Sequence, residues 1–425
     1  MRLRRTAVAA AMCFWCVSSW AQQPGILTLD EAFARVIARH PDLARFRYSR
    51  DGAQAEVEEA AQRPEFRAGI ESENWPRTGS KSGPGEAQVT LSLASALELG
   101  GKRAARIAVA GARLDALGLE EEARRLDLLA EVARRFLDLL ASQYLLKIAE
   151  ADFSQREKVV QAATQRVRAG ASPDSVRLMA EAAVSRAMLR RNRTQAETRA
   201  AARSLAALWN QRSPDFERAA GDPLIPVAVP SIDALSALLE GNPQLRQFAD
   251  EKRLREARVQ LARSAGTPDI EWQAGLRRLE STKEWTAVLG VSVPLGTRAR
   301  SAPRVKAAQA ELAALSLEHE AEEITLYATL IDAHARLTAA RSEQEVARTD
   351  LLPRLEQAER AAERAYRAGA LSYLEWAQIQ SETTAARQEQ LQAAIEAHRA
   401  LIEIQRLTGQ PFIAAEFSST TEVPR

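Results

Sequence analysis

The sequence has little of several residue types, and each shortage limits what the chain can be. Only 5% of its 425 residues are aromatic, and 27% are charged. It contains no uninterrupted stretch of about 20 apolar residues, which excludes a bundle of membrane-spanning helices. Lysine and arginine (58) nearly balance aspartate and glutamate (56), so the chain lacks the basic excess typical of nucleic-acid-binding proteins. The abundant alanine, leucine, arginine and glutamate indicate long helices packed closely over small side chains.

Residues suited to chemistry are equally scarce. The acidic cluster at 318–323 would be spread around the whole circumference of a helix, which indicates a solvated face rather than a cation site. No glycine-rich phosphate loop and no nucleophile arrangement is present. We therefore expect no catalytic residue, no cofactor, no metal site and no enzymatic activity. The four histidines are scattered without metal-ligand spacing: His40, His319, His334 and His398.

The only two cysteines, Cys13 and Cys16, lie in an N-terminal segment typical of a cleaved signal peptide. Three arginines within the first five positions precede an apolar stretch at 7–17, and small residues follow at Ser19 and Ala21. The apolar stretch is too short for a permanent membrane anchor, and the residues before each cysteine make a poor lipid-attachment box. We expect residues 1–21 to be removed, with no lipid anchor, leaving an exported chain without cysteine.

The chain repeats itself at an offset of about 200 residues. The segment Arg168-Ala169-Gly170-Ala171 recurs as Arg367-Ala368-Gly369-Ala370, 199 positions later. A unit of this length is too large for a solenoid repeat, so a duplication is expected. We predict a first repeat at 22–221, a linker at 222–230, a second repeat at 231–412 and a flexible tail at 413–425.

Each repeat is expected to contain a helical hairpin of unusual length, at about 101–211 and about 304–408. No proline occurs between Gly101 and Ser172, where apolar residues recur at three- and four-residue steps. A helix of about 65 residues would measure roughly 100 Å, far longer than an ordinary globular helix. In the second repeat Pro353 predicts a kink or break, and each glycine turn is expected to end its rod in a left-handed conformation.

Each repeat also contains a predicted β-hairpin, at about 66–99 and about 270–295. Apolar and polar residues alternate with period two along four segments of about ten residues, the length of a tilted transmembrane strand. Two ordinary surface hairpins of a soluble protein remain an alternative. Four strands cannot close a barrel and open edges are forbidden in lipid, so a membrane location predicts a trimer with twelve strands. Polar side chains then expected to line the lumen are Arg67, Glu71, Glu73, Glu271, Gln273 and Arg277.

This order of elements resembles the TolC-like outer-membrane factors over roughly residues 26–412. The resemblance is carried by the two glycine turns, by the start Leu27 to Ala32, by the strand exit Leu97 to Arg103, and by its duplicate Val293 to Gly296. The string Glu98 to Arg103 further resembles the branch that serves cobalt–zinc–cadmium cation efflux.

The resemblance implies a mostly α fold with a β-barrel portion, in which a homotrimer forms a twelve-stranded barrel among outer-membrane lipids and a helical tunnel in the periplasm. It also implies a periplasmic membrane-fusion adaptor and an inner-membrane pump of the resistance-nodulation-division (RND) type as partners. The adaptor-docking tips would be the two turns, Arg168, Ala169, Gly170 and Ala171, and Arg367, Ala368, Gly369 and Ala370. Tunnel-entrance acids would be Asp174 and Glu375, for which a solvated helix-end charge is the alternative.

We therefore predict a passive export duct in the outer membrane of a Gram-negative bacterium, most consistent with divalent heavy-metal cations as substrates. A duct for drugs or for type I protein secretion is the alternative within the same class. A soluble periplasmic coiled-coil scaffold is the alternative from another class. The role of the loop at 76–85 is left open.

Overall fold

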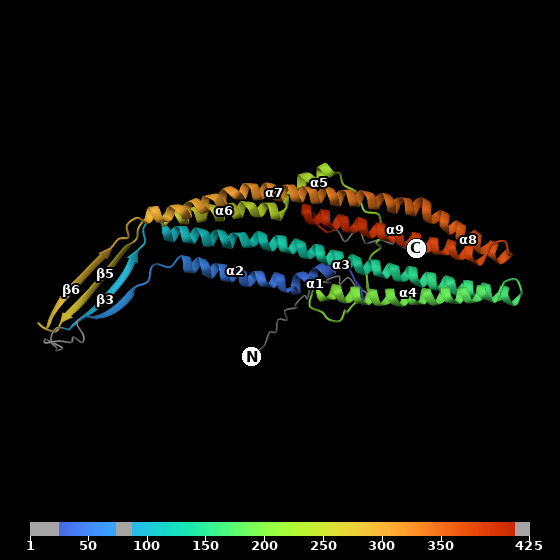
Figure 1. The fold of residues 1–425 in the computed structure, drawn as a ribbon, viewed down its shortest axis with the longest axis horizontal. Coiled ribbons are helices and arrows are strands. Elements are labelled where there is room, and N and C mark those ends of the chain that lie inside the picture. The colour runs from blue at the N-terminus through green and yellow to red at the C-terminus, as the bar shows by residue number, and fades with distance from the viewer. Residues whose placement is uncertain (1–24, 74–86, 413–425) are drawn as a thin grey trace, which may run out of the picture.

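The molecule is an elongated bundle of helices with a small β-sheet at one end (Figure 1). The structure, a computed structural model, describes residues 25–73 and 87–412. The expected signal peptide at 1–21, the loop at 76–85 and the tail at 413–425 lie outside the described residues. Most of the described chain is helical, and the predicted mostly α class with two long helical hairpins and four strands is confirmed.

The described part of the first repeat contains four helices, with a turn between the first two. His40 ends α1, and its Nδ1 accepts a hydrogen bond from the backbone N–H of Asp42 at 3.2 Å. Pro41 then begins α2 at the position where a missing N–H costs nothing. The elements are α1 (Leu29–Arg39), α2 (Pro41–Ala60), β2 (Arg67–Glu73), β3 (Gln88–Leu97), α3 (Lys102–Arg168) and α4 (Asp174–Ala207). The return helix α4 therefore ends four residues before the expected Gln211.

The second repeat has the same order with two interruptions. A 3-10 turn, η2 (Leu239–Gly241), separates its first two helices, and a π-helical turn, η3 (Ala347–Leu351), divides its long rod. The elements are α5 (Ile232–Leu238), α6 (Pro243–Ser264), β5 (Ile270–Leu279), β6 (Glu284–Ser292), α7 (Thr297–Val346), α8 (Leu352–Ala368) and α9 (Tyr373–Thr408).

The start of α7 differs from the expectation. The helix begins at Thr297, seven residues before the predicted Arg304, so that Pro303 lies inside it. Gly296 has a φ of +77° and sets the chain into the helix, and the Arg300 N–H already donates to the Gly296 carbonyl at 3.2 Å. Pro303 is the seventh residue of α7 and removes one backbone hydrogen bond, yet the helix continues through it. The break expected at Pro353 is present, as the π-turn immediately before α8.

The segment that joins the two repeats runs along α7 and is held there by side chains. The His334 ring lies 2.9 Å from the Pro230 carbonyl, Arg341 donates to Val227 at 2.9 Å, and Gln344 donates to Leu224 at 2.8 Å. These bonds satisfy carbonyls of a segment that has no helix or sheet partner. Two short strands, β1 (Ile26–Leu27) and β4 (Arg218–Ala219), pair in parallel nearby.

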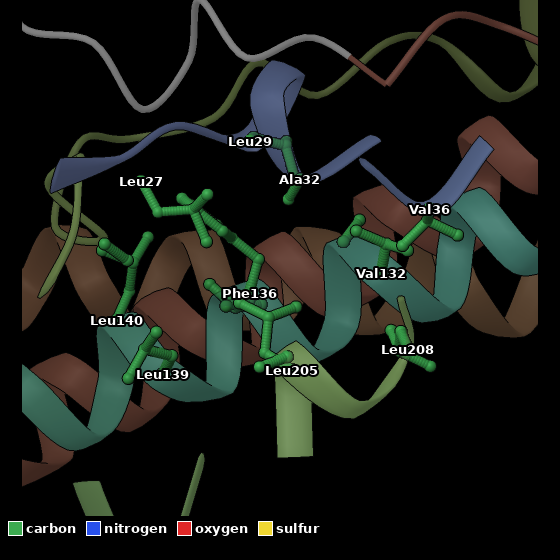
Figure 2. Close-up of a cluster of buried hydrophobic side chains, with 14 of the residues drawn as sticks. Leu27, Leu29, Ala32, Val36, Val132, Phe136, Leu139, Leu140, Leu205 and Leu208 are labelled. Carbon is green, nitrogen blue, oxygen red and sulfur yellow. The ribbon is translucent and has the colours of Figure 1, made fainter. Parts of the chain in front are cut away.

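The apolar core follows the rods as separate clusters rather than one globule. The largest cluster packs α1 against the middle of α3 and the end of α4, where Phe136, Leu205 and Ala32 are fully buried (Figure 2). A second cluster joins α5, α7 and α9. A third lies near the glycine turns and contains Tyr366, Tyr373 and Trp376. Burial along so much of each rod explains how helices of this length are stable.

The four long strands form one antiparallel sheet in the order β2-β3-β5-β6. The two hairpins meet through β3 and β5, so the sheet joins the repeats. Strands β2 and β6 are its edges, and neither has a further strand partner among the described residues.

Candidate functional site

The two glycine turns lie at the end of the molecule opposite the sheet (Figure 1). Gly170 has a φ of +69° and Gly369 a φ of +82°. In the first turn Ala171 donates to the Arg166 carbonyl at 2.9 Å and Gly170 donates to Val167 at 3.0 Å. The second turn repeats both bonds, Ala370 to Ala365 at 2.9 Å and Gly369 to Tyr366 at 3.1 Å. Both are Schellman caps, so the duplication extends to individual hydrogen bonds.

Arg166 connects the two turns. Its guanidinium donates to the Tyr366 carbonyl and lies 4.9 Å from the centre of the Tyr366 ring. The same group donates to the Ala171 carbonyl at 3.3 Å and to the Ser172 hydroxyl at 3.2 Å. One side chain therefore binds carbonyls of both hairpins. The position 199 residues later is Ala365, so the second hairpin has no counterpart.

The two expected entrance acids are both engaged close to their own helix ends. Asp174 accepts from Arg177 at 2.7 Å, and this bond lowers the pKa of its carboxyl. Glu375 accepts from the Ser372 N–H at 2.9 Å and from the Ser372 hydroxyl at 2.7 Å, which lowers its pKa as well. Ser372 in turn accepts from the Glu375 N–H, completing a capping box. Each carboxylate stabilises the start of a helix.

At the other end of the molecule, the register of the sheet places polar side chains on one face. Glu71 pairs with Thr90, Thr90 with Arg277, and Arg277 with Thr286, in a row across all four strands. The six residues expected to line a lumen lie on this face: Arg67, Glu71, Glu73, Glu271, Gln273 and Arg277.

Arg277 ties the polar face together. Its Nε donates to the Thr90 hydroxyl at 3.0 Å, and Nη1 lies 3.3 Å from Gln88 Oε1 and 3.6 Å from the Glu73 carboxylate. The neighbouring row contains Gly275, where an added Cβ would lie 2.6 Å from the Leu91 carbonyl. Only glycine fits that position, because the backbone of the neighbouring strand β3 approaches it closely.

The opposite face of the sheet is apolar and exposed. Leu289 is 83% exposed and Ile70 is 76% exposed, far above the values of a protein core. Trp272 packs edge-on against Phe66 near the helices, and Trp285 lies at the far end under Arg278. Further exposed apolar side chains on this face are Val89, Leu91, Leu93, Leu97, Leu276 and Val291. An exposed apolar surface of this kind marks an interaction site or contact with lipid.

Comparison with known proteins decides the class of molecule that carries these two surfaces. The sequence profile of the outer membrane efflux protein family matches residues 33–211 and again residues 234–410. The chain belongs to the outer membrane efflux protein family. The TolC-like resemblance is confirmed, and the protein is an efflux channel rather than an enzyme.

Individual relatives agree with this assignment. The chain is 29% identical to the cobalt-zinc-cadmium resistance protein CzcC of Cupriavidus metallidurans over 314 residues, 74% of this chain and 75% of the relative. It is 27% identical to the nickel-cobalt-cadmium resistance protein NccC of Alcaligenes xylosoxydans xylosoxydans, over 64% of this chain and 62% of the relative. A crystal structure of CusC superposes with a TM-score of 0.76 at 16% identity, covering 96% of this chain and 98% of that chain.

Elsewhere in this outer membrane efflux protein, the histidines and the acidic cluster that were first considered as chemical groups make contacts that stabilise the fold. Burial lowers the pKa of His398 to about 4, and its ring lies 3.2 Å from the Pro223 carbonyl. Within the acidic cluster, Glu318 accepts from Arg255 at 2.7 Å. Residues 25–73 and 87–412 contain no group of three potential ligands that could hold a metal ion. None of their helices is long and apolar enough to cross a membrane.

Two residues of these surfaces were missed by sequence reasoning. Arg166 lies two positions before the first repeated turn motif, and its partner Tyr366 is 200 residues away. Gly275 lies in a strand that reads as ordinary alternation. A glycine inside a strand pattern is the one signal that could have identified it. No comparable local signal marks Arg166.

Proposed function

We propose that three copies of this chain close a twelve-stranded barrel in the outer membrane and continue it as a helical tunnel in the periplasm. The supporting observation is the sheet itself, with an exposed apolar face, a polar face and two open edges. Unpaired strand edges are not tolerated in lipid, so neighbouring copies would pair β2 of one with β6 of the next. The six polar-face residues from Arg67 to Arg277 would then line the lumen.

The proposal includes the origin and processing of the chain. Residues 1–21 would be removed on export, without a lipid anchor, and the repeats 22–221 and 231–412 would descend from a duplication joined at 222–230. An intact mass measured on protein from the outer membrane tests the processing, because it reports both cleavage and lipid attachment.

A matched pair of substitutions tests membrane insertion. Leu289→Arg places a charge on the apolar face and should cost about 2–4 kcal/mol near the middle of a bilayer. Ser292→Arg adds the same group on the polar face, where it pairs with Glu271 in the register. Heat-modifiable trimers should be lost from outer-membrane fractions for the first variant and retained for the second. Recovery of the unaltered protein as a monomer in the periplasmic extract would favour the soluble scaffold instead.

The substrates we propose are divalent metal cations, passed on by a periplasmic adaptor and an RND-type pump. The similarity to CzcC and NccC supports this assignment. The polar face of the sheet supports it independently, because four carboxylates outnumber two arginines there: Glu71, Glu73, Glu271 and Glu284 against Arg67 and Arg277. An excess of carboxylates lining a pore favours cations. In this scheme the two glycine turns dock the adaptor, and no ion is held permanently.

The experiment is growth of a deletion strain on graded zinc, cobalt, cadmium, nickel and copper, beside detergents and antibiotics. Cell metal content is read by mass spectrometry, and the same strain carrying the gene on a plasmid is the control. Sensitivity and accumulation confined to divalent cations are expected. Sensitivity to drugs alone, or a defect only in protein secretion, would retain the duct and replace its substrate.

A further inference from the structure

The end of the tunnel that carries the glycine turns is strongly basic. We define the tip region as residues 158–177 and 360–376. Within it, seven cationic side chains face three carboxylates, a net charge of +4 in each chain. The cations are Lys158, Arg166, Arg168, Arg177, Arg360, Arg364 and Arg367, and the carboxylates are Asp174, Glu363 and Glu375.

All three carboxylates of the tip region are already engaged within it. Asp174 is bound by Arg177 at 2.7 Å, Glu363 by Arg367 at 2.6 Å, and Glu375 by its own helix cap. The guanidinium of Arg166 is directed at carbonyls. Four exposed cations remain that form no ion pair within the described part of the chain: Lys158, Arg168, Arg360 and Arg364.

One of these four cations, Lys158, lines a groove between the ends of α3 and α8. The groove has a volume of about 680 Å³ and is lined by Lys158, Arg166 and Arg367 together with glutamine, alanine and the Gly369 turn, but by no acidic side chain. A larger groove farther along the rods, of about 880 Å³, mixes both signs, with Asp152 and Glu197 beside Arg190. The groove at the turns therefore differs from this one in having no acidic side chain in its lining.

We propose that this groove and the four exposed cations bind an acidic face of the adaptor's helical hairpin. The inference rests on the proposed function, since it names the chemistry of the partner that docks there. Three copies bring three such basic regions together, and carboxylates of a bound partner would relieve their mutual repulsion. Charge complementarity of this kind steers encounter and selects partners.

The same charge balance assigns a further role to the partner. A divalent cation approaching the bare tunnel end meets uncompensated positive charge, because the cations of the tip region outnumber its carboxylates by seven to three. Carboxylates on the adaptor would neutralise the end and supply the negative surface along which cations enter. Docking and access for the substrate would then depend on the same contact.

The test uses the full-length trimer in detergent and two synthetic antiparallel helical hairpins that differ only in having glutamate or glutamine at the turn. The glutamate hairpin should bind at least about tenfold more tightly, and raising salt from about 50 to about 500 mM should remove most of that difference by screening. The double variant Lys158→Glu/Arg364→Glu should lose the preference. Arg304→Glu/Lys306→Glu, at the sheet end of α7, changes the same charge and should keep it.

Two results would overturn the proposal. Equal binding of the glutamate and glutamine hairpins would show that the partner's acidic groups do not contribute to binding. Binding to vesicles containing phosphatidylglycerol, but to neither hairpin, would assign the basic end to lipid headgroups. Channel conductance of the same trimer in a planar bilayer is measured in parallel. Conductance without a preference for the glutamate hairpin would contradict only this inference. Absence of trimers or of conductance would contradict the proposed duct.

Discussion

The two helical hairpins come from one repeated plan and have diverged in different places. In the first hairpin α3 runs 67 residues without interruption, whereas the corresponding rod of the second is divided by the π-turn η3 and Pro353. Position 154, which corresponds to Pro353 at the offset of 199, is Ser154. The two turns have the same caps, but of the rods that lead to them one is continuous and the other is divided.

The return helices differ in how they begin. α9 starts with Ser372 and Glu375 in a capping box, whereas α4 starts after Pro173, which offers no side-chain cap. Arg166 is present only in the first hairpin and reaches over to the second. The comparison indicates that the two hairpins share the backbone turn. They differ in the continuity of the rod, in the cap of the return helix and in the Arg166 contact between the hairpins. The following experiments break or sharpen that comparison.

The largest effect is expected where the hairpins are alike. Replacing Gly170 and Gly369 together by leucine should abolish efflux while leaving trimers in the outer membrane. An added Cβ has open space at Gly170 and only ordinary contact, 3.7 Å from Arg166, at Gly369. The damage therefore comes from the left-handed backbone, at roughly 1–2 kcal/mol for each turn.

Metal export by cells carrying each variant measures this effect. Gly111→Ala, inside α3 where nothing lies within 4 Å of an added Cβ, is the matched control and should export normally. Efflux that survives the double change would show that the turns are helix caps alone and that docking occurs elsewhere.

The next effect tests the difference between the rods. Ser154→Pro introduces into α3 the residue that the second rod already has, and should destabilise the helix by about 3 kcal/mol. Pro353→Ala should change stability far less, because η3 already interrupts the hydrogen-bond ladder there. Thermal dissociation of the purified trimer followed by circular dichroism compares the two. Ser154→Ala is the control, and equal losses for Ser154→Pro and Pro353→Ala would contradict the assigned asymmetry.

Sequence reasoning predicted the features that local pattern determines. Alternation with period two assigned Glu71 and Arg277 to one face of the sheet, and the register agrees because a shift by one residue would reverse both faces. The predicted start of the second rod at 304 is seven residues too late, because Gly296 sets the chain into the helix at Thr297. Whether Asp174 and Glu375 act at a tunnel entrance depends on how copies assemble, which local pattern does not specify.

The contact that only the first hairpin makes should have an intermediate effect. Arg166→Ala removes a bond that a charged group makes to the Tyr366 carbonyl, at a cost of roughly 1.5–3 kcal/mol, although Gly369 still donates to that carbonyl. Hydrogen exchange should quicken in peptides covering both turns, since the residue binds both. Arg168→Ala, an exposed neighbour, should change protection little. Faster exchange confined to the first turn would show that Arg166 does not couple the hairpins.

The smallest effect concerns the two helix starts. Ser372 lowers the pKa of Glu375 below its ordinary value of 4.5, so the stabilisation is fully present above that pH and is lost as the pH falls through the lower value of the folded protein. Ser372→Ala should remove the dependence, together with about 1 kcal/mol of capping energy. Hydrogen exchange of the first turn of α9 is measured between pH 3 and pH 6 in about unit steps and compared with the intrinsic exchange rate at each pH. Its protection should fall on acidification in the original protein only. The start of α4 also contains an acid, but Asp174 is bound to Arg177 rather than to a cap. Removing Ser372 should therefore leave α4 unchanged, and a parallel change at both starts would mean that acidification loosens the whole tip rather than one cap.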